Sequence, residues 1–271
     1  MSAQFRDTFQ RTLDGLDAGI QVRHITTFNV ESCNPDDTVK SVIDREDWRI
    51  FSQILVRHSG HAVGILERKG ADSARTVAEQ MRPLSDAMLI SADAPLSEFL
   101  NVCHHNSFRL VVDRTRVAGI VTVSDLQKLP VRLYAYTRIA HLEMLMAEII
   151  RQRSHNDDGS WKHYVEPSMI KMAEKRRAAY ERENLNLPLI EYTDFGDKVQ
   201  ALCGLCHELA PAQPDLQAVK QLRHEVMHTR PVDQSELGIS TFLERLSLTD
   251  KWIKGLDDFV VNTKDNEEKA D

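Results

Sequence analysis

The sequence predicts a chain of the α+β class, with a mixed first half and an all-helical second half. Before Pro130, short β-rich runs alternate with helical patterns, and after it the pattern is helical almost throughout. The first half also contains one unit twice, which implies two similar units packed against each other. We therefore expect domains at residues 1–130 and 131–262, followed by a charged, disordered tail at 263–271.

The composition is that of an ordinary globular protein. The chain has 271 residues, of which 42% are hydrophobic, and a net charge of −7 that argues against a general nucleic-acid coat but leaves a local RNA site open. The polar N-terminus predicts no secretory signal, and no apolar run is long enough for a membrane span. The four cysteines suggest no disulfide framework, and the Cys-x-x-Cys pair at 203–206 lies in an apolar helical run, so we expect buried free thiols in a cytoplasmic protein.

The repeated unit runs from about residue 33 to 69 and again from about 91 to 129. Each copy begins with a polar turn, continues with an amphipathic helix and closes with two short apolar strands. In the second copy the strands are residues 108–112 and 117–121, and the turn at 113–116 joins them as a hairpin.

The second copy ends with Gly-Ile-Val-Thr-Val-Ser-Asp-Leu at residues 119–126. Two hydroxyls and a carboxylate at the start of a helix can cap that helix. The same groups can bind the hydroxyls of a ribose, and the backbone amides at the helix N-terminus favour phosphate. This segment resembles the closing motif of the CBS domain, so the first half resembles a tandem CBS pair of β-α-β-β-α units. The resemblance implies that Thr122, Ser124 and Asp125 contact an adenine nucleotide (AMP, ADP or ATP) as a regulatory ligand.

The first copy departs from the motif. Its last strand, residues 62–66, runs into Glu-Arg-Lys at 67–69 without a Thr-x-x-Asp pattern. At most one nucleotide site per chain is therefore expected. The alternative is a ligand-free CBS pair that serves as a dimerisation scaffold, with Asp125 acting only as an N-cap.

The second half is predicted to form a bundle of helices. The first helix has an apolar stripe of five residues, Ile139, Leu142, Leu145, Met146 and Ile149. Five helices are expected, over residues 131–153, 167–184, 193–209, 215–229 and 236–261.

The stretch Leu-Arg-His-Glu-Val-Met-His at residues 222–228 satisfies two unrelated catalytic patterns. Arg223 and His228 fit the Arg-x-x-x-x-His motif of metal-independent ribonucleases. His224, Glu225 and His228 fit His-Glu-x-x-His, in which two histidines on one helix face bind zinc and the glutamate polarises the metal-bound water. The Gly and third His that continue this motif in metzincins are absent. Pro231 follows instead and is expected to end the helix.

An all-helical domain with this motif at the end of a late helix resembles the HEPN family over residues 131–262. Zinc proteases of the other type usually carry a sheet beside the helix, and the second half has no convincing strands, which favours HEPN. The resemblance implies a metal-independent endoribonuclease that needs no cofactor for catalysis and acts as a homodimer with opposed motif helices.

The residue types suit this chemistry, in which the ribose 2′-hydroxyl attacks the neighbouring phosphate. His228 can transfer protons near neutral pH, Arg223 can bind phosphate with forked hydrogen bonds, and His224 can orient the phosphate or share the proton transfer. Glu225 is expected to be a surface or supporting group. Residues five apart on a helix differ by roughly 140° in direction, so Arg223 and His228 require a distorted helix or a composite site in a homodimer.

Together these features predict a sensor–effector protein, in which adenine nucleotide bound to the CBS pair regulates cleavage of RNA. Such layouts are typical of toxin-like or phage-defence proteins, an argument by analogy that leaves an antitoxin or other protein partner open. The alternative is a non-catalytic, nucleotide-sensing module that dimerises or binds RNA, and a zinc metallopeptidase is a further one.

Overall fold

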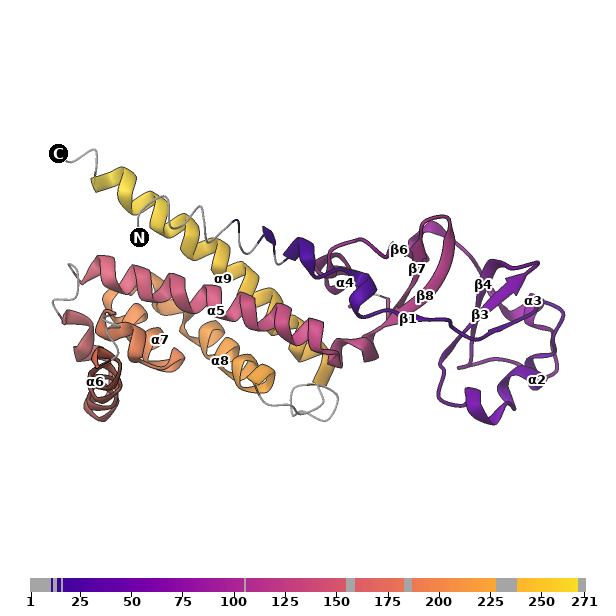
Figure 1. Cartoon of the computed structure of the whole chain (residues 1–271), viewed down its shortest axis with the longest axis horizontal. Coiled ribbons are helices and arrows are strands. Elements are labelled where there is room, and N and C mark those ends of the chain that lie inside the picture. The colour runs from indigo at the N-terminus through magenta and orange to yellow at the C-terminus, as the bar shows by residue number, and fades with distance from the viewer. Residues whose placement is uncertain are drawn as a thin grey trace. The chain divides into compact units, whose positions relative to one another are not determined.

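The chain forms two compact units, one from Asp14 to Val131 and one that begins at Arg132 (Figure 1). Within the described part of the chain, no helix is both long and apolar enough to cross a membrane. Side chains are described as far as residue 259. The computed structural model describes residues 11, 14–15, 17–104, 106–154, 159–182, 187–227 and 238–267.

The first unit contains two four-stranded sheets of the same design. The first has the order β2-β3-β4-β5, with β2 and β3 parallel and the other pairs antiparallel. Its strands are β2 (Ser32–Cys33), β3 (Gln53–His58), β4 (His61–Glu67) and β5 (Arg82–Pro83). The helices α2 (Val39–Ile43) and α3 (Val77–Gln80) and a 3-10 helix at Glu46–Trp48 accompany it.

The second sheet has the order β1-β8-β7-β6, with β6 and β7 parallel and the other pairs antiparallel. Its strands are β1 (Thr27–Phe28), β6 (Leu89–Ser91), β7 (Phe108–Asp113) and β8 (Arg116–Thr122). Its helices are α4 (Leu96–Val102) and 3-10 helices at Val22–His24, Asp86–Met88 and Val123–Gln127. The predicted hairpin between the two apolar strands of the second copy is confirmed, because β7 and β8 pair from Phe108 to Asp113.

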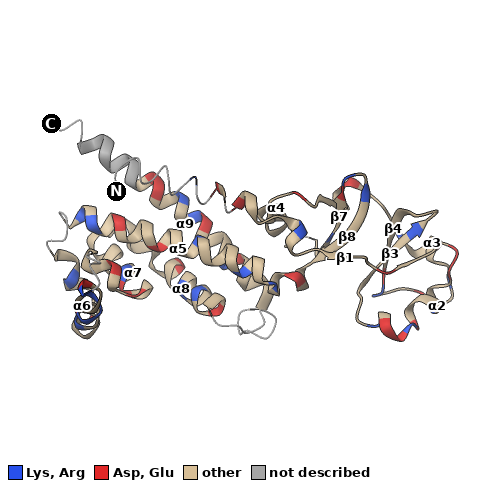
Figure 2. Cartoon of the chain, in the orientation of Figure 1, with Lys and Arg blue, Asp and Glu red and all other residues tan. Residues whose placement is uncertain are grey.

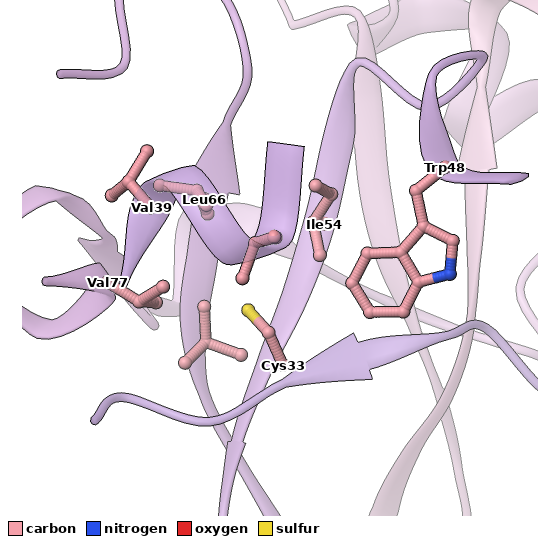
Figure 3. Close-up of a cluster of buried hydrophobic side chains, with 8 residues drawn as sticks. Cys33, Val39, Trp48, Ile54, Leu66 and Val77 are labelled. Atoms are coloured by element: carbon pink, nitrogen blue, oxygen red, sulfur yellow. The ribbon is translucent and has the colours of Figure 1, made fainter. Parts of the chain in front are cut away.

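Two apolar cores hold this unit together. One lies under the helices of the first sheet, where Trp48 packs near Cys33 and Ile54 (Figure 3). The other joins the two sheets, since Leu55 and Ile65 from the first pack with Phe108, Leu110, Val117 and Ile120 from the second. The two repeats therefore share one interior, as the repeat in the sequence predicts.

The two repeats exchange their opening strands. β3 and β7, like β4 and β8, are 55 positions apart at matching points such as Gly64 and Gly119. β1 precedes the first repeat but pairs with β8, and β5 precedes the second but pairs with β4. The repeats therefore begin earlier than the expected residues 33 and 91. Two-residue strands carry no detectable periodicity, so the sequence could not reveal them.

The short helices before the exchanged strands are exchanged as well. Val22 N donates to Ala94 O at 2.9 Å in the second repeat, and Val77 N donates to Asp37 O at 2.9 Å in the first. Residues 20–28 and 75–83 are thus the equivalent opening segments, each lying on the opposite repeat.

The second unit is built of helices. Its five main helices agree with the predicted ones in number and order, and the five residues of the predicted apolar stripe on the first of them are all buried. All strands of the described residues lie between Thr27 and Thr122. The helices are α5 (Leu129–Arg153), α6 (Pro167–Glu181), α7 (Phe195–Leu205), α8 (Gln213–Met227) and α9 (Gly238–Glu267), with 3-10 helices at Ser160–Tyr164, Leu189–Tyr192 and His207–Ala212.

The four cysteines are free and buried, which confirms the prediction for the Cys-x-x-Cys pair. Cys203 lies inside α7, and Cys206 follows the end of that helix rather than lying within it. Burial raises the pKa of the Cys206 thiol to about 11, so this thiol is protonated and unreactive at neutral pH.

Candidate functional site

The predicted nucleotide residues lie where β8 ends. Thr122 donates from both its backbone N and its Oγ1 to Asp125 Oδ2, at 2.6 and 3.0 Å. The Thr122 side chain accepts a backbone N–H in return, so the pair forms a capping box for the five-residue 3-10 helix Val123–Gln127. The N-cap of this 3-10 helix is therefore Thr122, and Asp125, which the alternative interpretation expected to be the N-cap, is its partner at the third helical position.

The second oxygen of this buried carboxylate has a different environment. Asp125 Oδ1 lies 2.7 Å from Lys128 Nζ, which also donates to Ile25 O at 2.5 Å. Ser124 is exposed, and its hydroxyl makes no hydrogen bond to the described residues. The segment of five residues from Ser124 to Lys128 thus contains a buried carboxylate, an ammonium group paired with it, and an exposed hydroxyl.

The corresponding segment of the first repeat is closed by an arginine. The Arg68 guanidinium donates to the backbone carbonyls of Ile43, Trp48 and Phe51, at 2.9, 2.7 and 3.0 Å. Its backbone N donates to Ser52 O at 2.9 Å, as Val123 N does to Ser107 O in the second repeat. Arg68, the residue that follows β4, therefore binds three backbone carbonyls of its own repeat.

The first repeat also lacks the carboxylate. The position that matches Asp125 is Gly70, which has a φ of 82°. The position that matches Thr122 is Glu67, whose carboxylate is bound by Arg82 at 2.8 Å. The two repeats thus differ at these positions, with a carboxylate and hydroxyls in the second and an arginine bound to three carbonyls in the first.

A match to a protein-family model bears on this unit. A CBS domain is found at residues 72–132. This range contains the second repeat complete, from its exchanged opening segment to the end of the Thr122 capping box. No curated protein matches the chain.

Solved structures of CBS domains are also similar to this chain. The CBS domain of a bacterial CNNM/CorC family Mg²⁺ transporter in complex with ATP is 20% identical, with 45% of this chain and 93% of that chain covered and a TM-score of 0.36. An uncharacterized conserved protein from Pyrococcus horikoshii is 19% identical, with 39% of this chain and 88% of that chain covered and a TM-score of 0.36. Hypoxic Response Protein I with two coordinated zinc ions is 20% identical, with 39% of this chain and 95% of that chain covered and a TM-score of 0.33.

The motif of the second half lies on the last turns of α8. Leu222 is buried, Arg223 and Glu225 are half-buried, and His224 is exposed. Arg132 Nη1 of α5 donates to Glu225 O at 3.3 Å, which satisfies one of the carbonyls at the end of this helix. His228 lies outside the described residues, so neither the Arg-x-x-x-x-His pair nor the zinc alternative is tested by this geometry.

Arg223 contacts an acidic residue that the sequence did not single out. Its Nε lies 3.4 Å from Glu143 Oε2, and the other oxygen of Glu143 accepts from Lys198 Nζ at 3.0 Å. Lys198 is 2% exposed and also donates to Thr193 O at 2.8 Å. α5, α7 and α8 are thus joined by one charged cluster, Lys198–Glu143–Arg223.

Another acidic residue, Glu191, interacts electrostatically with the cluster. Burial raises the pKa of the Glu191 carboxyl, against the opposite effect of Lys198. Glu143 and Arg223 are 80 positions apart in the chain, and no short motif connects them. Only the folded arrangement of three helices could reveal the cluster.

Charges in the helical unit are mixed. Figure 2 shows both basic and acidic residues along α5 and along α9. On α6, Arg176 pairs with Asp194 at 3.0 Å and Arg177 with Glu181 at 2.9 Å.

Proposed function

We propose that the second CBS repeat binds an adenine nucleotide and that the bound nucleotide regulates the helical unit. The observation that carries this proposal is the contrast between the repeats. At matching positions the second has Thr122, Ser124 and Asp125, and the first has Glu67, Lys69 and Gly70 beside the Arg68 closure.

A nucleotide would bind to the carboxylate, the ammonium group and the hydroxyl of this segment. A carboxylate accepts hydrogen bonds from both hydroxyls of a ribose, and Asp125 Oδ1 becomes available if Lys128 turns away. The displaced ammonium group would then pair with phosphate oxygens, so its charge stays compensated. Ser124 Oγ adds a hydrogen bond at the mouth of the site.

Asp125→Asn is expected to weaken binding of ATP, ADP or AMP by about tenfold or more, because a charge-assisted hydrogen bond contributes about 1.5–3 kcal/mol. Isothermal titration calorimetry measures the affinity of each nucleotide. Glu67→Gln is the matched control, since Glu67 ends the equivalent strand in the closed repeat. Equal weakening by both changes, or no binding at millimolar nucleotide, would contradict the proposal.

We further propose that the helical unit is a metal-independent endoribonuclease of HEPN type, with Arg223, His228 and His224 as its catalytic residues. Support comes from the all-helical unit, from the place of the motif at the end of α8, and from the partly exposed Arg223 guanidinium. Arg223 would stabilise the phosphate and His228 would transfer the proton.

Arg223→Ala is expected to lower the rate of RNA cleavage in excess EDTA by on the order of 10²- to 10³-fold. His228→Ala should cost a similar factor, and Glu225→Gln should stay active. Cleavage of a labelled RNA pool measures all four proteins. RNA cleavage that is lost both in EDTA and in Glu225→Gln would contradict the metal-independent mechanism, and a zinc-binding assay would then test the His-Glu-x-x-His alternative. No cleavage by any form would favour a non-catalytic, nucleotide-sensing or RNA-binding module.

The proposed enzyme is a homodimer, and α5 offers a surface for it. Leu133 and Tyr136 are 46% and 44% exposed and lie three residues apart on α5. This spacing places them on one stripe of the helix, which two copies could bury against each other. A protein that cleaves RNA while sedimenting as a monomer at micromolar concentration would rule the composite site out.

Regulation requires that the nucleotide bind two states of the protein differently. If ATP, ADP and AMP leave both RNA affinity and cleavage rate unchanged, the sensor proposal fails while the nuclease proposal stands. Toxin-like or phage-defence activity would follow from regulated RNA cleavage, and an antitoxin partner remains open.

A further inference from the structure

The Lys198–Glu143–Arg223 cluster has a fixed end and a free end. Lys198 is fixed, because it is 2% exposed and its ammonium group is bound by Glu143 Oε1 and Thr193 O. Moving it would leave a buried charge without a partner, which is strongly unfavourable. The carboxylate of Glu143 is therefore held in one orientation from inside the unit.

Arg223 is the free end. Its side chain is 40% exposed, its Nε faces Glu143 Oε2 at 3.4 Å, and its two Nη groups make no hydrogen bond to the described residues. A guanidinium whose Nε side faces a carboxylate keeps its two terminal nitrogens for a second, bidentate acceptor such as a phosphate. A side chain ordered before binding also loses less conformational freedom when the substrate arrives.

We infer that Glu143, fixed by Lys198, is a positioning residue that holds the Arg223 guanidinium ready for the phosphate of an RNA substrate. This inference rests on the ribonuclease proposed above. It adds two residues from α5 and α7 to a site that the sequence motif places on α8 alone.

Glu148 provides a matched control on the same helix. It is a buried glutamate of α5, where Glu143 is half-buried, and it is bound by Arg151 at 2.6 Å and by Gln152. No contact joins it to Arg223 in the described residues. Glu143→Gln and Glu148→Gln thus remove equivalent charges, and only the first removes the partner of Arg223.

The first measurement is the Arg Nε–Hε spectrum of uniformly ¹⁵N-labelled full-length protein, with the Arg223 signal assigned by Arg223→Lys. In Glu143→Gln this signal should shift and its proton should exchange with water about tenfold faster. In Glu148→Gln it should stay as in the wild type. An Arg223 signal that is unchanged in Glu143→Gln overturns the inference, whether or not the protein cleaves RNA.

The second measurement is cleavage, with kcat and KM determined separately. Glu143→Gln should lower kcat by on the order of 10²-fold, the cost of a misplaced catalytic group. Added to Arg223→Ala, it should cause no further loss, because both changes remove one interaction. A further loss in the double variant overturns the inference. A wild type that cleaves nothing, with the expected spectrum, refutes the nuclease and supports the positioning of Arg223.

A second variant guards against misfolding of Glu143→Gln. Lys198→Met together with Glu143→Gln removes the buried ammonium group and its carboxylate partner and keeps the volume of the lysine side chain. This double variant should fold and show the same change in the Arg223 signal. An Arg223 signal like that of the wild type would overturn the inference.

Discussion

Gly119→Ala is expected to lower the unfolding free energy of the unit at residues 14–131 by about 3 kcal/mol, at the upper end for overpacking. A Cβ at this position would lie 2.5 Å from Thr27 O and 2.6 Å from Thr26 Cγ2. The carbonyl belongs to β1, so the clash can be relieved only by pushing the exchanged strand off the sheet. Urea denaturation followed by circular dichroism measures the change.

Gly64→Ala should act in the same way on the other exchanged strand, since its Cβ would lie 2.5 Å from Arg82 O. The expected loss is smaller than at Gly119, because the next neighbour is the flexible Met81 Sδ at 3.2 Å. Gly255→Ala in α9 is the control. Its Cβ would meet nothing nearer than 3.9 Å, and it should stabilise the helix by about 0.5–1 kcal/mol. An unchanged urea midpoint in Gly119→Ala would show that β1 is not fixed to β8.

The helical unit is expected to lose about 3 kcal/mol of stability between pH 6.5 and pH 4 through one residue. Burial, with a smaller contribution from Arg138, lowers the pKa of His141 from its ordinary value of 6.5 to about 4. The unfolded chain therefore binds a proton in this range that the folded chain does not. The contribution of His141 is complete above pH 6.5 and is lost as the pH falls toward 4.

His141→Gln removes the titrating ring and isolates this effect. The variant should show a flatter dependence of unfolding free energy on pH between 6.5 and 4, measured by urea denaturation at each pH. The raised pKa of Glu191 has the opposite effect, because its protonation favours the folded state as the pH falls. That effect is present in both proteins and cancels in the comparison. Parallel curves for wild type and variant would contradict the prediction.

Local features of this protein could be predicted from its sequence. The two short apolar runs at 108–112 and 117–121, with the turn between them, predicted the hairpin of β7 and β8, and the helical spacing after residue 131 predicted the buried stripe of α5. The Thr-x-x-Asp spacing likewise located the capping box, because that arrangement depends on residues only three apart.

Long-range features could not be predicted in this way. The exchange of β1 and β5 depends on strands of two residues whose partners lie in the other repeat. Glu143 meets Arg223 only after α5 and α8 have packed, and Arg68 closes the first repeat through three carbonyl groups that carry no sequence signal. A local sequence pattern indicates the secondary structure of a segment. Which other segment it contacts depends on the topology of the whole unit.

The exchanged strands also affect how the chain can fold during synthesis and how it can be divided. β1 emerges early from the ribosome but has no partner until β8 has been made, so the two repeats must complete their sheets together. Residues 72–132, although they match a CBS domain, would leave the edge of β8 uncovered without β1, and their own β5 would lack β4. Such a fragment would expose unpaired strand edges and aggregate, whereas a fragment of residues 14–131 would keep every strand of both sheets paired.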